Sequence, residues 1–268
     1  MARNANWVPD VDPGLPSASR LCDYLLGGGH NFAADRALAE ELLLVQPNAR
    51  TIARLNRAFL RRAVLHLVDL GIRQFLDLGS GIPTVGNVHE VAHRAAPDAR
   101  VVYVDYEDVA VAHGRMTLEH EDRATVLQED VTEPATVLTA ACRTGLLDLA
   151  EPVGVLAVGV FHFVPPERDP AGVLAHYRDA LALGSALALS QFTSDLQPVE
   201  MAGIVEVMKK STNPVFPRTR AEITALFEGF DVVPPGVVPL PLWRPEAEIA
   251  GRDDPDKAGI LAGVGHKR

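Results

Sequence analysis

The sequence predicts a doubly wound α/β domain with a helical addition at its N-terminus. Two observations predict this class. Short apolar runs alternate with segments of helical periodicity through residues 72–268, as expected of parallel strands joined by crossover helices. Residues 17–71 show helical periodicity alone, and we expect them to form a cap or lid. With 268 residues, 47% of them hydrophobic, the chain can bury a full core.

Charge, cysteine content and hydrophobic runs exclude several classes of partner and of covalent cross-link. Lys and Arg total 25 against 35 Asp and Glu, a net charge of −10, and no basic run exceeds Lys209-Lys210, so we expect no nucleic-acid partner. Cys22 and Cys142 match no zinc or redox spacing, and we expect no disulfide. The sequence shows neither a signal peptide nor a membrane span, so we expect a cytoplasmic protein without a membrane partner; its oligomeric state is left open.

The elements follow in order along the chain. Residues 1–16 contain three prolines and no periodicity, and we expect a flexible arm there. The helical pattern that follows ends at Gly71, which would act as a C-terminal cap. Strands are expected at 74–78, 101–104, 125–128, 153–161, 185–190, 230–238 and 259–264. Helices are expected at 88–95, 109–116 and 171–183, and from the Thr219-x-x-Glu222 capping box to Gly229.

The turn Gly79-Ser80-Gly81 joins the first strand to a helix that we expect to start directly from it. A Gly-x-Gly turn lets the backbone approach a ligand closely, and it points the backbone N–H groups of the following helix at a negatively charged group of that ligand. Asp77 would face a pyrophosphate there, and two like charges at about 4 Å repel by on the order of 4 kcal/mol, which disfavours NAD and nucleoside triphosphates. S-adenosylmethionine has no phosphate and carries an ammonium and a sulfonium, so Asp77 favours that cofactor. The alternative is that Asp77 only braces the turn.

Acids also end the next two strands. Asp105 would accept both ribose hydroxyls, and Tyr106 would cover the adenine. Asp130 would accept from the adenine amino group while the Val131 N–H meets a ring nitrogen. Each acid alone is equally consistent with a loop or a helix cap, but three acids at three successive strand ends favour a cofactor site.

With these residues in place, the chain resembles class I S-adenosylmethionine-dependent methyltransferases, and closer still an actinobacterial family of largely unassigned substrate. The resemblance extends over residues 19–245, and its distinctive segments are 23–28, 31–36, 73–84, 102–105, 162–164 and 243–245. It implies a Rossmann-like, seven-stranded sheet with an antiparallel last strand, and a cofactor at the carboxyl ends of the first strands. Gln191 departs from the histidine that is common in the family.

The expected activity is methyl transfer from S-adenosylmethionine to a small-molecule acceptor. Phe161 and His162 are assigned to the cofactor site, and His162 is also the candidate base, unless it only packs against the cofactor. Tyr24, His30 and Asn31 flank the glycine run that contains Gly28. This run would hinge a lid over the site or, alternatively, form a plain helix–helix turn.

Two other functions are weighed against this one. The first is a non-catalytic protein that senses S-adenosylmethionine or its demethylated product. The second is a zinc hydrolase, because His89-Glu90-x-x-His93 matches the H-E-x-x-H pattern. On a helix the two histidines fall about 100° and 140° from Val88, away from the apolar face. We therefore expect both histidines to face solvent and no metal to be bound, since no third ligand follows at a suitable spacing.

Overall fold

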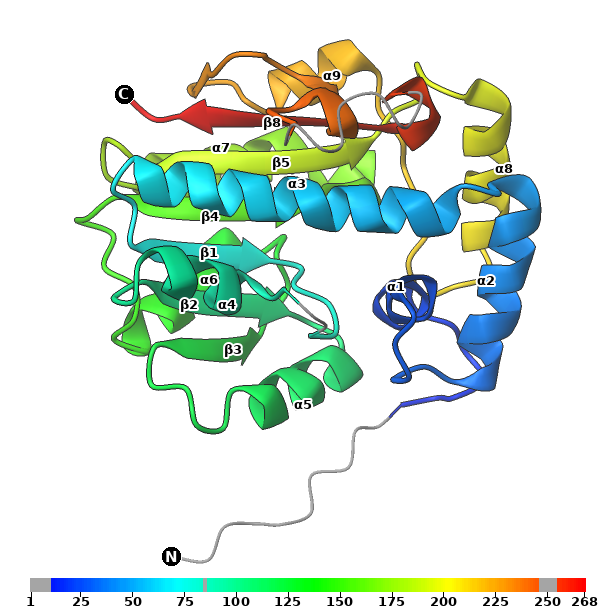
Figure 1. Ribbon diagram of the computed structural model, residues 1–268, viewed down its shortest axis with the longest axis horizontal. Coiled ribbons are helices and arrows are strands. Elements are labelled where there is room, and N and C mark those ends of the chain that lie inside the picture. Colours follow the sequence, from blue (N-terminus) through cyan, green and yellow to red (C-terminus); the bar gives the residue numbers. More distant parts are fainter. Residues whose placement is uncertain (1–10, 84–85, 246–254) are drawn as a thin grey trace, which may run out of the picture.

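The computed structural model describes residues 11–83, 86–245 and 255–268. In Figure 1 a central sheet lies between helices on its two faces, and α1, α2 and α8 stand together beyond one end of it. The strands are β1 (Gln74–Leu78), β2 (Arg100–Asp105), β3 (Ala124–Gln128), β4 (Val153–Val158), β5 (Ala186–Phe192), β6 (Asp231–Val232), β7 (Val238–Pro239) and β8 (Ile260–His266). The α/β class predicted from the sequence is confirmed.

The strand order is β3-β2-β1-β4-β5-β8-β6, and β7 also pairs with β8. Strands β1 to β5 are parallel, and β8 is antiparallel to β5, as the family resemblance implies. The chain returns from β3, at one edge, to β4 on the other side of β1. In open α/β sheets such a reversal opens a crevice at the carboxyl ends of the strands, where ligands bind.

Nine α-helices are described. They are α1 (Ala18–Leu26), α2 (Ala33–Val45), α3 (Ala49–Asp69), α4 (Val88–Ala95), α5 (Asp108–Thr117), α6 (Pro134–Arg143), α7 (Pro170–Ala180), α8 (Pro198–Met208) and α9 (Arg220–Ala225). Helix α3 ends as predicted at Gly71, whose φ is 90°, and the N–H of Ile72 donates to the carbonyl of Leu67 at 3.1 Å. None of the described helices has the length and apolar character needed to cross a bilayer.

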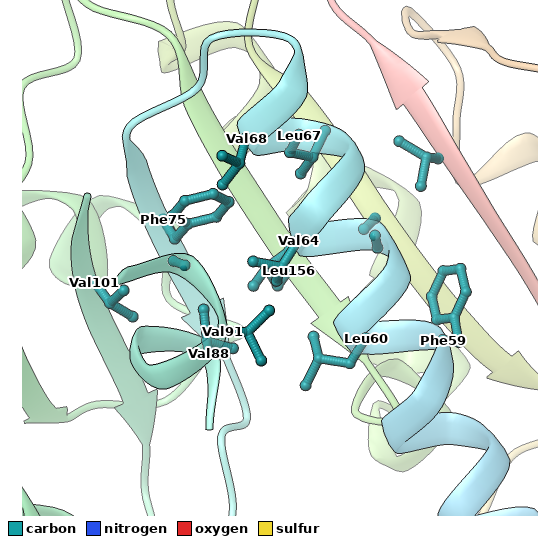
Figure 2. Packing of buried hydrophobic residues seen from close by; sticks show 14 of the residues in the cluster. Phe59, Leu60, Val64, Leu67, Val68, Phe75, Val88, Val91, Val101 and Leu156 are labelled. Atoms are coloured by element: carbon teal, nitrogen blue, oxygen red, sulfur yellow. The ribbon is translucent and has the colours of Figure 1, made fainter. Parts of the chain in front are cut away.

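Side chains alternate between the two faces of β1. Phe75 faces α3 and α4, and Figure 2 shows it beside Val68, with Val64 next to Leu156 of β4. Leu76 and Leu78 belong to the core of the opposite face, which α6, α7 and α9 cover. Both faces are therefore apolar, which explains why the parallel strands appear in the sequence as continuous hydrophobic runs.

The helices before β1 pack in two different places. Helix α3 packs on one face of the sheet, whereas α1 and α2 pack with α8 in a separate core beyond the end of the sheet (Figure 1). We call α1, α2 and α8 the cap. The cap stands at the carboxyl ends of the parallel strands, so residues before and after the sheet both contribute to whatever binds there. Most of the segment expected to form the N-terminal arm, residues 1–10, lies outside the described residues.

Two predicted elements near the C-terminus are wrong in extent. The strand expected at 230–238 is divided into β6 and β7, because Pro234 and Pro235 have no N–H to donate to a ladder. The sheet therefore has eight strands rather than seven. The helix that Thr219 opens does have the predicted capping box with Glu222, but it ends at Ala225, and a turn continues to Gly229.

Candidate functional site

A cavity of about 230 Å³ lies at the carboxyl ends of β1, β2 and β4, beneath α1, α3 and α8. Among the residues predicted for the cofactor site, those that line the cavity are Asp77, Gly79, Ser80, Gly81, Asp105, Tyr106, Val131 and His162. Asp130 and Phe161 do not line it. The cavity lies at the point where the strand order reverses between β1 and β4, which is the place the sheet topology predicts.

The glycine turn is tightly fitted against neighbouring strands. Gly79 and Gly81 have φ values of 68° and 64°, and a Cβ at Gly79 would lie 2.3 Å from Cγ2 of Val160. The N–H groups of Gly79 and Ser80 donate to the carbonyl of Val104 at 2.8 and 3.1 Å. These groups hold the turn on β2 rather than pointing at a ligand. The prediction that a helix starts at the turn is wrong, since α4 begins at Val88, after a loop.

Asp77 is buried at the end of β1. The pKa of its carboxyl is raised to about 7, mainly by burial; the nearby guanidinium of Arg57 opposes the rise, and the negative charge of Asp105 adds to it. Arg57 comes from α3 and lines the same cavity. Sequence reasoning missed Arg57, because no motif marks it and only the docking of α3 across the sheet brings it to β1.

Asp105 is buried at the end of the adjacent strand. Its Oδ2 accepts from the Gly81 N–H at 2.8 Å and its Oδ1 from the Glu107 N–H at 2.9 Å. Burial raises the pKa of this carboxyl to about 6, although both of those hydrogen bonds lower it. Next to it, the half-exposed Tyr106 accepts a hydrogen bond at its hydroxyl from Nδ2 of Asn213.

The third acid lies differently. Asp130 is exposed and accepts from the N–H and hydroxyl of Thr132 at 2.8 and 2.7 Å, and Arg168 approaches it to 3.3 Å. Val131, the next residue, is buried and does line the cavity. Phe161 is fully buried in the core beneath α6 and α7. The structure therefore brings two of the three predicted acids together and leaves the third on the surface.

His162 lies in the short 3-10 helix η1 (Phe161–Phe163), directly after β4. Its ring is buried, with the rings of Phe163 and Phe192 each 4.4 Å away. Its Nδ1 has no hydrogen-bond partner within the described parts of the chain. Burial, with the positive charge of Arg218, lowers the pKa of the imidazole to about 3, so the ring is neutral at any physiological pH. Gln191, the family departure, is buried outside the cavity lining.

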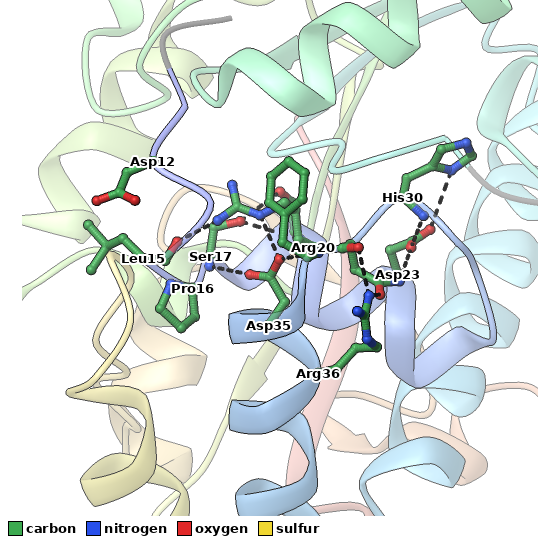
Figure 3. A network of polar contacts seen from close by, with 12 residues as sticks. Asp12, Leu15, Pro16, Ser17, Arg20, Asp23, His30, Asp35 and Arg36 are labelled. Carbon is green, nitrogen blue, oxygen red and sulfur yellow. Dashed lines mark hydrogen bonds and ion pairs between the residues drawn. The ribbon is translucent and has the colours of Figure 1, made fainter.

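The glycine run after α1 folds around one carboxylate. Asp23 accepts from the N–H of His30 and from Nδ2 of Asn31, both at 2.8 Å, and a Cβ at Gly28 would lie 2.0 Å from its Oδ1 (Figure 3). Tyr24 donates instead to Glu40 at 2.7 Å. None of these four predicted lid residues lines the cavity.

Helix α1 contributes to the cavity through its other face, which carries Leu21, Cys22 and Leu25. Its first turn is fastened at two points. The N–H of Ala18 donates to Oδ1 of Asn213 at 2.8 Å, and the hydroxyl of Ser19 donates to Glu107. Behind α1, Figure 3 shows Arg20 paired with Asp35 of α2, at 2.8 Å. Helix α1 thus covers the cavity in this structure.

The H-E-x-x-H histidines have other partners. His89 Nδ1 lies 2.8 Å from the hydroxyl of Tyr103, and His93 Nε2 lies 2.9 Å from the carbonyl of Ala99. The expectation that both face solvent is wrong. His89 is buried, because the first turn of α4 packs on β2, and the side chain of His93 is only 17% exposed. Glu90 accepts from the backbone of Gly86. In the parts of the chain that the structure describes, no three His, Cys, Asp or Glu side chains are grouped as metal ligands.

The site suits a ligand that brings positive charge. Two carboxyls buried side by side at the ends of β1 and β2 have raised pKa values, because burial disfavours their charge. A cationic ligand would stabilise both as carboxylates. A side chain at Gly79 would collide with Val160, so only glycine fits this place in the cavity wall. S-adenosylmethionine, with its ammonium and sulfonium, fits this donor set.

Comparison with known proteins gives two kinds of match. A family model described as S-adenosyl methyltransferase matches residues 4–268. The crystal structure of a DUF574 family protein from Streptomyces avermitilis is 33% identical with a TM-score of 0.92, covering 96% of this chain and 99% of that one. A proposed methyltransferase from Thermobifida fusca is 37% identical with a TM-score of 0.89, covering 95% and 96%. No curated protein matches the chain.

Proposed function

The chain belongs to the S-adenosyl methyltransferase family, with S-adenosylmethionine as its cofactor, and from this premise we propose that it transfers a methyl group to a small molecule held in the cavity. The observation that carries the proposal is the pair of buried carboxyls, Asp77 and Asp105, at the ends of adjacent strands beside the glycine turn. Burial makes it costly to ionise two such carboxyls in one cavity, and a cationic ligand would offset that cost.

Each predicted residue has a proposed part in holding the cofactor. When bound, S-adenosylmethionine supplies a methyl group on a positively charged sulfur that is displaced in line. Asp77 holds its ammonium. Asp105 accepts the ribose hydroxyls while it keeps its two backbone hydrogen bonds, since a carboxylate has about four acceptor positions. Tyr106 covers the adenine, whose edge meets Val131. Asp130 joins this contact only if its exposed side chain turns from Thr132 and Arg168 toward the cavity.

His162 is proposed to contact the acceptor, since it lies at the end of β4 on the cavity wall. Its neutral ring can accept a hydrogen bond from a hydroxyl or an N–H nucleophile. Because burial disfavours the protonated ring, His162 is better suited to aligning that nucleophile than to storing its proton. Alignment supplies much of the rate in a displacement of this kind.

Turnover is the test of this proposal. The protein is incubated with methyl-labelled S-adenosylmethionine and a panel of small phenols, indoles and amines, and S-adenosylhomocysteine is measured by mass spectrometry. We expect acceptor-dependent product with the wild type and a large loss with Asp105→Ala. Cofactor binding without product from any acceptor would contradict methyl transfer and favour the sensor.

A further inference from the structure

We infer that the methyl acceptor is a compact, uncharged molecule with an apolar ring system, bound in the part of the cavity between the cap and α3. The inference rests on the proposed methyl transfer and adds the chemical class of the acceptor. It follows from how charge, apolar surface and space are distributed around the cavity.

The charged side chains of the cavity wall gather on one side. Asp77, Asp105 and Glu107 stand at the ends of β1 and β2, and Arg57 of α3 faces Asp77. All four surround the place proposed for the cofactor. Among the described residues, no other charged side chain lines the cavity.

The opposite side of the cavity is apolar. Its wall is formed by side chains of the cap, α3 and β5, among them Leu25, Leu42, Ile52, Phe192, Ile204 and Met208. All but Phe192 are at most 6% exposed. A charged acceptor placed here would lose its hydration without gaining a counter-charge, which disfavours its binding. An apolar ring, in contrast, gains from every contact with this wall.

The polar groups of the apolar side are all neutral. The thiol of Cys22 is neutral, because the ordinary pKa of a cysteine lies well above 7. Asn56 accepts a hydrogen bond from Ser190 at 2.6 Å, and its Nδ2 lies 2.7 Å from the position of a Cβ on Gly159. His162 Cε1 lies 3.9 Å from the same position. Asn56 and His162 thus flank the end of β4, where an acceptor hydroxyl or N–H would meet the methyl group.

The available space favours a small acceptor. The cavity measures about 230 Å³, and a cavity of about 150 Å³ lined by Leu, Ile and Phe holds one benzene ring. This volume does not hold the whole cofactor and a second molecule together, so the cavity must widen on binding. A compound of one or two fused rings requires less widening than a macromolecular side chain on a bulky backbone.

Calorimetry with matched probes tests this inference. The protein is first titrated with S-adenosylhomocysteine, and the saturated complex is then titrated with naphthol and indole, and with naphthoate and naphthylmethylammonium as charged counterparts. We expect the neutral probes to bind and the charged probes to bind more than about tenfold more weakly. Equal binding of a charged probe, or no binding of either neutral probe to the saturated complex, would overturn the inference.

Two methionines of α8 give a matched pair of variants. Met208 lines the cavity and Met201 does not, yet both are 3% exposed and belong to the same core. We expect Met208→Ala to weaken naphthol binding roughly tenfold, the scale of a lost apolar contact in a ligand pocket, and Met201→Ala to leave it unchanged. Equal effects of both variants would contradict the assigned wall. Failure to bind S-adenosylhomocysteine would instead count against the proposed function itself.

Discussion

Asp77 makes cofactor binding depend on pH near neutrality. Its pKa of about 7 in the free protein, set mainly by burial, means that about a tenth of the carboxyls are ionised at pH 6 and about nine tenths at pH 8. A ligand ammonium favours the ionised form, so the apparent affinity scales with the ionised fraction. We expect the ionisation of Asp77 to make the binding of S-adenosylhomocysteine, which keeps the ammonium, about tenfold weaker at pH 6 than at pH 8.

The assay is calorimetric titration from pH 6 to pH 8 in two buffers of different ionisation enthalpy. Near pH 7 about half a proton should be released for each ligand bound, because half the carboxyls are protonated before binding. Asp77→Asn should bind more weakly, and its Kd should vary less with pH, since Asp105, with a pKa of about 6, changes only from about half ionised at pH 6 to almost fully ionised at pH 8. A wild-type Kd that is constant over this range, with no proton release, would refute the role given to Asp77.

Four further outcomes are expected. Gly79→Ala and the uncrowded Gly145→Ala should each lose about 1–2 kcal/mol of folding stability through their positive φ. Only Gly79→Ala should also bind the cofactor more weakly, because its Cβ would collide with Val160. Equal cofactor affinities of the two variants would refute the tight fit of the turn. His162→Ala should lower kcat about 10²-fold and leave the Kd of the cofactor unchanged, and full turnover on a true acceptor would remove it from the mechanism. Residues 20–36 should exchange their amide hydrogens more slowly when cofactor is added, as expected of a lid. An unchanged exchange rate in this segment would exclude the lid. Dialysis against EDTA should leave cofactor affinity unchanged, and a loss restored by zinc would revive the metal alternative.

The same carboxyl links stability to pH. The pKa of Asp77 is higher in the folded protein than its ordinary value of 3.8, so the folded chain holds this proton more tightly than the unfolded chain. The contribution of Asp77 to stability therefore falls as pH rises from about 4 to about 7 and is constant above that, with a total of at most about 4 kcal/mol. Asp77→Asn removes a buried charge at pH 8 and should therefore raise the Tm at that pH. Stability lower than the fold could reach is common at binding sites, because function requires the charged residue.

The sequence predicted best what depends on neighbours along the chain. The bounds of β1, the cap of α3 at Gly71 and the capping box at Thr219 follow from local periodicity and turn chemistry, and all are confirmed. The parallel topology then places the ends of β1 and β2 side by side, so that Asp77 and Asp105 meet in one cavity. The family resemblance is confirmed as well.

What the sequence did not predict depends on how distant elements dock. Arg57 and Asn56 reach the cavity only because α3 lies across the sheet, and no local pattern marks either residue. His89 is buried because Tyr103 of β2 accepts its backbone N–H, a contact that a helical projection does not contain. The acid after β3 was expected beside the other two, but its loop turns it toward Thr132 and Arg168.

The claim that Asp105 and its neighbours form the cofactor pocket is tested most directly by titrating the wild type and Asp105→Ala with S-adenosylmethionine. We expect saturable binding to the wild type and its loss in Asp105→Ala, which should stay folded by circular dichroism. Unchanged binding in Asp105→Ala would place the cofactor elsewhere, and no binding to the wild type would contradict the assignment of the cavity.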